Sequence, residues 1–212
     1  MARDDAAEAR DTASAHAAYA QQADGDRSFA AGDRAAAAAD REQAALDRHR
    51  SADDLQNAYR DELTGALVRR AGWDQLSRAV DRSHRTGESL IVAFVDVDHL
   101  KRVNDEQGHV GGDVVLRAVG AALRTGLRSY DIVLRYGGDE FVCGLTDLRL
   151  AESERRFAYV SDVLSRAASG ASISVGLAEL RDKENIAAVI DRADHEMYER
   201  RKMRRTDASD TA

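Results

Sequence analysis

The sequence predicts an α+β fold, in which a central mixed sheet is surrounded by helices and preceded by an N-terminal helical segment. Three observations predict it. After a first helix near residue 63, the apolar spacing follows the order β-α-β-β-α-β-α. Two of these strands are joined by a tight turn, which requires antiparallel pairing, and the intervening helices must pack on the sheet. The composition also changes near residue 58, where a helical segment without a clear core ends.

Residues 1–58 consist largely of Ala, Asp and Arg. Alanine and arginine favour helices, and a seven-residue repeat of an Asp-Arg pair is typical of a coiled coil. The repeat occurs at Asp26-Arg27, Asp33-Arg34, Asp40-Arg41 and Asp47-Arg48. Arg41 and Arg48 interrupt the apolar seam, so a solvated helix or a partly disordered arm remains an alternative.

The first three elements of the globular part follow from their apolar spacing. Leu76 and Val80 belong to a helical pattern that predicts a helix over Leu63–Arg85. Leu90–Val97 is a nearly continuous apolar run, as expected of a strand buried on both faces. Helical spacing resumes over Val110–Arg128, which predicts a second long helix.

The remaining elements begin with a hairpin. Ile132–Tyr136 and Glu140–Leu145 alternate with a period of two around a Gly-Gly pair, which predicts two paired strands. Helical spacing predicts a helix over Leu150–Ala168, an apolar run predicts a strand over Ala171–Leu177, and a last helix follows over Ile186–Arg205. We therefore expect one globular domain at residues 59–206 and a disordered tail at 207–212.

Composition limits the classes of function. The chain of 212 residues is 43% hydrophobic, which permits a sizeable core, and its net charge of −7 argues against a general nucleic-acid coat. The single cysteine, Cys143, excludes an intramolecular disulfide. No apolar run reaches transmembrane length and the N-terminus lacks the apolar part of a signal peptide, so we expect a cytoplasmic protein without a membrane segment.

The hairpin carries an unusual pair of acids, Asp139 and Glu140, directly after Gly137 and Gly138. The glycines can supply the positive φ angles of a tight turn. Adjacent carboxylates at a strand end repel each other unless a cation or solvent neutralises them. The pattern therefore indicates either a solvated turn or a cation site.

A second group of acids ends the buried strand, at Asp96 and Asp98. Strand alternation places both on one face, and the neighbouring hairpin would bring Asp139 and Glu140 close. Oxygen ligands of this kind suit Mg²⁺, with Mn²⁺ as the alternative ion, and paired metals suit phosphoryl or nucleotidyl transfer. The alternative is that Asp96 or Asp98 caps a turn.

The residues that follow could bind a nucleotide. Lys101 stands where an ammonium could meet a phosphate, although a surface lysine is the alternative. Asn104 and Asp113 together could pair with the edge of guanine, with His109 beside them, because amide and carboxylate groups complement its donors and acceptors. Capping of turns and helix starts is the competing role for Asn104 and Asp113.

From Asp61 to Arg205 the chain resembles the GGDEF domain, the diguanylate cyclase family. Five motifs carry the resemblance, in the order "DELTGALVRR", "DVDHLKRVNDEQGHVGGD", "RYGGDEF", "SISVG" and "RADHEMYERRKMRR". The resemblance implies condensation of two GTP to cyclic di-GMP, with release of two pyrophosphates, across a homodimer. The family fold, a sheet wrapped by helices, agrees with the elements expected above.

The resemblance also implies roles for individual residues. Asp96, Asp139 and the carbonyl of Val97 would ligate Mg²⁺, Glu140 would lie beside the metals, and Asp139 would act as the base. Lys101 would steady the developing charge. The nucleotide would be bound by Asn104, His109, Asp113, Gly137, Gly138, Arg201 and Arg205. Arg201 stands where the family has a lysine, and Leu100 where it usually has a phenylalanine.

The segment "RSYD" matches the RxxD site at which the family binds its product and is inhibited by it. Arg128 and Asp131 would carry that site. Because the signature acids are all present, the resemblance favours an active cyclase. A catalytically silent GGDEF module that binds GTP or cyclic di-GMP as an effector is the alternative.

Overall fold

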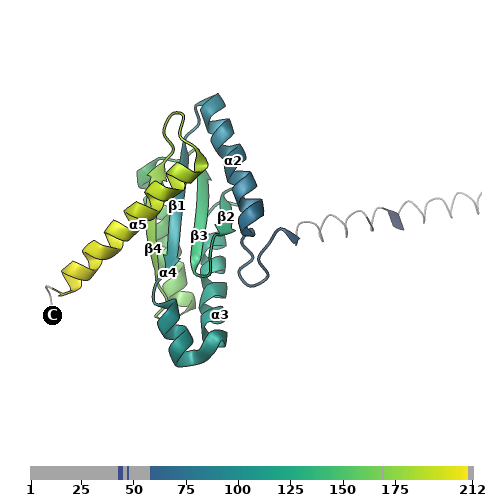
Figure 1. The fold of residues 1–212 in the computed structure, drawn as a ribbon. Coiled ribbons are helices and arrows are strands. Elements are labelled where there is room, and N and C mark those ends of the chain that lie inside the picture. Colours follow the sequence, from purple (N-terminus) through teal and green to yellow (C-terminus); the bar gives the residue numbers. More distant parts are fainter. Residues whose placement is uncertain (1–42, 45–46, 48–57, 169, 210–212) are drawn as a thin grey trace, which may run out of the picture. The chain divides into compact units, whose positions relative to one another are not determined.

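The computed structural model describes residues 43–44, 47, 58–168 and 170–209, and the side chains up to residue 203 (Figure 1). The chain divides into two compact units, Met1–Leu55 and Gln56–Ala212. Gln43, Ala44 and Asp47 are helical, as predicted for that segment. Residues 207–209, expected in a disordered tail, are helical instead. The rest of the expected coiled coil and of the expected tail lies outside the described residues.

The second unit is built on a four-stranded sheet. Its strands are β1 (Leu90–Val97), β2 (Ile132–Arg135), β3 (Glu140–Thr146) and β4 (Ile173–Glu179). The order across the sheet is β2-β3-β1-β4, and each neighbouring pair is antiparallel. A single parallel bridge between Leu67 and Leu134 extends the β2 edge, so the mixed character predicted for the sheet is confined to that bridge among the described residues.

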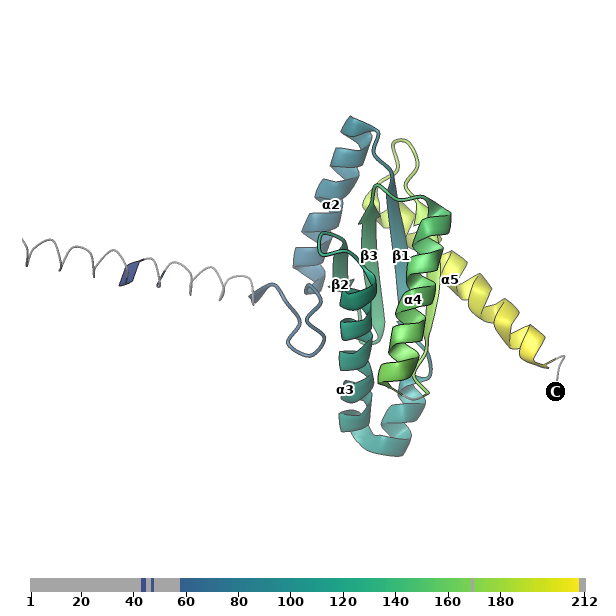
Figure 2. The ribbon, with the colours of Figure 1, turned by 180° about the vertical axis from the view of Figure 1, so that it is seen from behind.

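Helices cover both faces of this sheet. They are α2 (Arg69–Thr86), α3 (Leu100–Gly126), α4 (Leu150–Ala167) and α5 (Ile186–Ser209). Figure 1 shows α2 and α5 on one face, and the reverse view in Figure 2 shows α3 and α4 on the other. The predicted α+β fold with helices around a central sheet is thus confirmed.

The apolar run of β1 is buried by both helical layers. Val92 and Phe94 pack in the core under α2 and α5, whereas Ala93 and Val95 pack in the core under α3 and α4. This alternation explains why the strand reads as an uninterrupted apolar sequence. It also places Asp96, two residues after Phe94, on the α2 and α5 face at the end of the strand.

Two helices begin at different residues from those predicted. The first begins at Arg69 rather than Leu63, because Asp61 Oδ1 accepts hydrogen bonds from the Thr64 N–H (2.9 Å) and hydroxyl (2.6 Å) and closes a turn instead. The second begins at Leu100 rather than Val110 and includes a kink at Gly108, where φ is 74° and ψ is 173°. A residue without a side chain tolerates that conformation.

The hairpin between β2 and β3 closes as predicted, but without the expected positive φ angles. Gly137 and Gly138 are not among the glycines with positive φ. The N–H groups of Tyr136 and Gly137 both donate to the carbonyl of Glu140, at 2.8 and 3.2 Å.

None of the helices in the described part of the chain has the length and apolar character needed to cross a membrane.

Candidate functional site

A cavity of about 390 Å³ lies between α3 and the hairpin turn. It brings together six of the residues singled out in the sequence. These are Lys101, Asn104, His109, Asp113, Gly138 and Asp139. Residues from two motifs more than twenty positions apart therefore line one cavity, as the nucleotide-site prediction requires.

The kinked helix α3 forms one wall of this cavity. Asn104 precedes the kink at Gly108, and Asp113 follows it. Gly112 allows the two parts of the helix to meet, because a Cβ atom at this position would collide with the amide oxygen of Asn104. The kink therefore places an amide and a carboxylate on the same wall.

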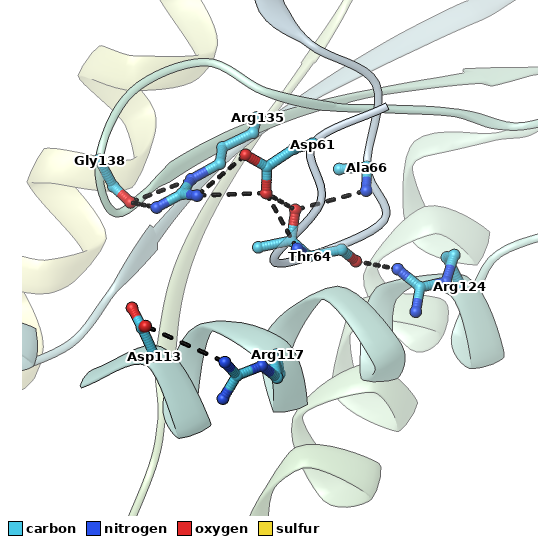
Figure 3. Close-up of polar contacts among 8 residues, drawn as sticks. All are labelled: Asp61, Thr64, Ala66, Asp113, Arg117, Arg124, Arg135 and Gly138. Carbon is cyan, nitrogen blue, oxygen red and sulfur yellow. Dashed lines mark hydrogen bonds and ion pairs between the residues drawn. The ribbon is translucent and has the colours of Figure 1, made fainter. Parts of the chain in front are cut away.

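Asp113 is only weakly held by its neighbours. Its carboxylate is 4.0 Å from Arg117 one helical turn away, and the two side chains are 45% and 56% exposed (Figure 3). Exposed ion pairs of this kind contribute about 0–1 kcal/mol. The carboxylate of Asp113 is thus open to an incoming hydrogen-bond donor.

The hairpin turn forms the opposite wall. A Cβ atom at Gly138 would have no atom within 4 Å, so the turn leaves open space toward the cavity. Gly137 does not line the cavity; a Cβ atom there would collide with the carboxylate of Glu140. The two glycines therefore have different roles, one beside the cavity and the other against an acid.

The predicted metal ligands meet at the same end of the sheet. Asp96 lies directly opposite Glu140 in the β1–β3 register, and the N–H of Val97 donates to the carbonyl of Asp139 at 3.0 Å. Burial raises the pKa of Asp96, Arg201 lowers it, and Asp139 raises it again. Burial also raises the pKa of Glu140, to which Asp139 and Asp96 add. The three carboxylates therefore repel one another.

A cation from α5 partly neutralises this group. Arg201 Nη1 donates to Asp96 Oδ1 at 2.6 Å, and Arg201 Nε is 3.7 Å from Asp98 Oδ1. Asp98 itself accepts hydrogen bonds from the hydroxyls of Ser172 (2.8 Å) and Ser174 (2.6 Å). Asp98 therefore anchors the start of β4, a structural role other than the turn cap raised above, whereas Asp96 is hydrogen-bonded to the guanidinium.

The acids are not gathered into a ready metal site. Among the described residues, no group of three or more His, Cys, Asp or Glu side chains is arranged to hold a metal ion. The carboxylates of Asp96 and Asp139 are close enough to influence each other's charge, and the backbone of Val97 is hydrogen-bonded to that of Asp139 at the strand end. Such oxygen donors have the chemistry that Mg²⁺ prefers.

Sequence reasoning missed two residues that position the hairpin turn, Arg135 and Asp61. Arg135 Nη1 lies 3.1 Å from both carboxylate oxygens of Asp61, and its Nη2 donates to the Gly138 carbonyl at 2.7 Å (Figure 3). Arg124 of α3 donates to the carbonyl of Thr64, in the turn that Asp61 begins. The signal was that Arg135 and Asp61 each begin a recognised motif.

The segment from Arg128 to Asp131 lies at a separate place. Asp131 Oδ2 accepts the N–H of Arg128 at 2.7 Å, while the buried Oδ1 has no hydrogen-bond partner among the described residues. Burial raises the pKa of Asp131. The guanidinium of Arg128 lies 5.5 Å from the ring centroid of Tyr130 and 3.8 Å from Glu152.

Arg205 lies in α5, but its side chain is outside the described part of the chain, so its predicted phosphate contact stays a prediction. Arg201 does not line the cavity and lies at the carboxylates instead. The roles assigned to the individual site residues likewise remain predictions.

The fold and this arrangement of acids define a class of protein. Residues 58–207 match the family described as "Diguanylate cyclase, GGDEF domain". The chain therefore belongs to the GGDEF domain family.

Named relatives of this chain agree with the family assignment. The chain is 36% identical over 158 residues to the diguanylate cyclase DgcP of Pseudomonas aeruginosa, covering 69% of this chain and 23% of that protein. It is 37% identical over 146 residues to the diguanylate cyclase DosC of Escherichia coli, covering 65% of this chain and 32% of that one. The chain thus spans a third or less of the length of these relatives.

Among solved structures, the diguanylate cyclase SiaD of Pseudomonas aeruginosa, in complex with its activator SiaC, superposes with a TM-score of 0.68 at 32% identity, covering 81% of this chain and 68% of that chain. The structure of the coiled coil and GGDEF domain of DgcB from Caulobacter crescentus, in complex with c-di-GMP, gives a TM-score of 0.68 at 25% identity. This match covers 76% of this chain and 91% of that chain.

Proposed function

We propose that this chain is a diguanylate cyclase, which condenses two GTP to cyclic di-GMP and releases two pyrophosphates. The observation that carries the proposal is the single cavity that joins Asn104 and Asp113 of α3 to Gly138 and Asp139 of the hairpin. A base-recognition wall thereby faces an acidic turn. Curated relatives of the matched region are named diguanylate cyclases, which supports the same conclusion.

In this proposal the two walls divide the nucleotide between them. Asn104 and Asp113, with His109 nearby, hold guanine, because a carboxylate accepts from its N1 and N2 hydrogens and an amide complements the other edge groups. Gly138 leaves room for the ribose and phosphates, and Gly137 beside it leaves room for the carboxylate of Glu140. Lys101 steadies charge that develops on the phosphate, and Arg201 and Arg205 bind the phosphates beyond the turn.

The carboxylates would hold Mg²⁺, with Mn²⁺ as the alternative ion. Asp96, Asp139 and the Val97 carbonyl offer oxygen ligands, and Glu140 adds negative charge beside them. When bound, the metal neutralises charge on the reacting phosphate. Asp139 would take the proton of the 3′-hydroxyl as that oxygen attacks the α-phosphate of the opposing GTP and pyrophosphate leaves.

Because each chain would hold one GTP, the reaction needs two chains with their cavities facing each other. A homodimer is therefore part of the proposal. The proposed reaction consumes GTP, a cytoplasmic nucleotide, so we propose a cytoplasmic location.

We further propose that cyclic di-GMP binds at Arg128 and Asp131 and inhibits the enzyme. The guanidinium of Arg128, 5.5 Å from the ring centroid of Tyr130, supports a ligand there, because arginine suits phosphates and the faces of purines.

One observation favours a second candidate, a silent module that binds GTP or cyclic di-GMP as an effector. The acids are not preassembled as a three-ligand metal site in the described part of the chain, and Asp96 is paired with Arg201. Such a module would bind nucleotide without releasing pyrophosphate.

Incubation with GTP and Mg²⁺, followed by chromatography of the nucleotides, separates the two candidates. Cyclic di-GMP from the unmodified chain but not from Asp139→Ala is the expected result, and ATP in place of GTP should give no cyclic product. Absence of cyclic di-GMP despite measurable GTP binding would favour the effector module.

A further inference from the structure

Arg201 holds a carboxylate that the proposed cyclase needs for metal. Its Nη1 is 2.6 Å from Asp96 Oδ1, and the two side chains are only 29% and 15% exposed. A partly buried charged hydrogen bond at this distance is stronger than an exposed ion pair. As long as it persists, one oxygen of Asp96 is engaged by a guanidinium.

The same guanidinium has a second, fixed anchor. Arg201 Nε lies 3.7 Å from Asp98 Oδ1, and Asp98 is held in place by the hydroxyls of Ser172 and Ser174. An arginine fork can approach two carboxylates at once, whereas a lysine ammonium is a single point of charge. Arginine at this position is therefore suited to hold Asp96 and Asp98 together.

The helix that carries Arg201 is closely packed against the sheet. A Cβ atom at Gly176 of β4 would collide with the carbonyl of Ala193 and the N–H of Met197, so the α5 backbone lies directly on the strand. In addition, the Leu177 N–H donates to Glu196 of α5 at 3.1 Å. Release of Asp96 therefore requires a swing of the Arg201 side chain, since the helix backbone is held.

We propose that Arg201 occupies Asp96 in the nucleotide-free protein and is drawn away by the phosphates of GTP, so that metal and nucleotide load together. This inference rests on the proposed cyclase function, because it takes Asp96 as a metal ligand and Arg201 as a phosphate ligand. Competition between a guanidinium and a divalent cation for one carboxylate keeps metal affinity low until a nucleotide is present. The binding of each ligand then favours the other, as linkage requires.

A titration of Mn²⁺ into the full chain without nucleotide tests the competition directly. Electron paramagnetic resonance measures the free ion at each step of the titration. Arg201→Gln should bind Mn²⁺ on the order of tenfold more tightly than the unmodified chain, equivalent to one decade in the dissociation constant. Arg201→Lys, which keeps the charge but loses the fork, should show a smaller gain in the same direction. Circular dichroism melting establishes that each variant is folded.

A neighbouring arginine supplies the matched control. Arg200 pairs with Glu154 and Glu196 rather than with Asp96. Arg200→Gln removes the same formal charge one residue away and should leave nucleotide-free Mn²⁺ affinity nearly unchanged. An equal gain in Arg200→Gln and Arg201→Gln would mean that net charge, not release of Asp96, sets the affinity, and would overturn the inference.

Asp96→Asn distinguishes failure of this inference from failure of the proposed function. If Asp96→Asn weakens Mn²⁺ binding and Arg201→Gln does not strengthen it, the metal site stands and the competition is refuted. If neither substitution changes Mn²⁺ binding, Asp96 is not a metal ligand in the nucleotide-free chain and the inference fails, whereas formation of cyclic di-GMP from GTP still decides the proposed function. In the Arg201→Gln background, Asp96→Asn should abolish the gain.

Discussion

Arg135 connects two motifs that are distant in sequence. Asp61 and Arg135 are separated by 74 positions, yet the guanidinium lies 3.1 Å from both Asp61 oxygens and also binds the Gly138 carbonyl. The two side chains are 20% and 23% exposed, so solvent screens the contact only in part. Arg135 thereby fixes the glycine turn of the candidate site to the turn that precedes α2.

We predict that Arg135→Lys loosens the hairpin turn, because lysine cannot bind Asp61 and Gly138 with one planar fork. Stability should fall by about 1–2 kcal/mol and GTP affinity should fall with it. Denaturant melts and GTP titrations measure both. A double-mutant cycle with Asp61→Asn should give a non-zero coupling energy; additive effects would contradict the assigned contact.

Asp131 permits a prediction about pH. Burial raises the pKa of its carboxyl. An acid whose pKa is higher in the folded than in the unfolded state reduces stability above both values, and this penalty disappears as pH falls below them. Asp131→Asn should therefore be more stable than the unmodified chain near neutral pH, with the difference shrinking toward about pH 4.

Thermal melts of Asp131→Asn and the unmodified chain across this pH range measure the difference. Asparagine can still accept the Arg128 N–H, so the comparison isolates the charge of the carboxyl. Asp162→Asn, an exposed change on α4, provides the control. A stability difference for Asp131→Asn that stays constant with pH would contradict the assigned cause.

Among the elements, the contact between β4 and α5 depends on Gly176. Its missing side chain lets the backbone at Ala193 and Met197 approach the strand. We predict that Gly176→Ala lowers stability by about 2 kcal/mol, because an added methyl must push a helix backbone away. Gly138→Ala is the matched control, since its Cβ would have no atom within 4 Å.

These two alanine variants should separate stability from binding. Gly138→Ala should melt like the unmodified chain but bind GTP more weakly, because the methyl group enters the cavity. Gly176→Ala should melt at a lower temperature. Equal melting temperatures for both variants would show that the close contact at Gly176 is not maintained in solution.

The strands were predicted well because β1 is an apolar run that packing buries on both faces, and the alternating pattern around the Gly-Gly pair marks the hairpin strands β2 and β3. The first residues of α2 and α3 were not predicted from the sequence. Leu63 and Leu67 keep helical spacing although the side chain of Asp61 closes a turn with Thr64. The polar stretch around Asn104 conceals a helix that bends at Gly108. Local spacing does not reveal a cap or a kink that tertiary contacts stabilise.

The same limit applies to the candidate site. Lys101, Asn104, His109 and Asp113 could be selected because their types and order suit a nucleotide, and the cavity brings them together. The pairings of Arg135 with Asp61 and of Arg201 with Asp96 span 74 and 105 positions. No local pattern specifies which carboxylate a distant arginine will choose.

For the whole molecule, the division into Met1–Leu55 and Gln56–Ala212 gives a prediction about assembly. If the first unit pairs two chains, it raises the effective concentration of the two half-sites. A chain of residues 56–212 should fold, because both core clusters lie within it, but its specific activity should fall at low protein concentration.

Measurement of cyclic di-GMP formation over a dilution series of both chains tests this. The activity of the shorter chain should recover at high concentration, where collision replaces tethering. Identical specific activity for the two chains at every dilution would show that residues 1–55 do not pair the domains.

Cys143 gives the chain a built-in reporter of its own opening. It is the single cysteine, it lies fully buried in the middle of β3, and burial raises the pKa of its thiol. A maleimide reacts with the thiolate and must reach it, so modification can proceed only when the strand separates from its neighbours. The labelling rate therefore measures how often β3, the strand that begins at Glu140, separates from its neighbours. Any ligand that stabilises this strand in the sheet should lower the rate of labelling.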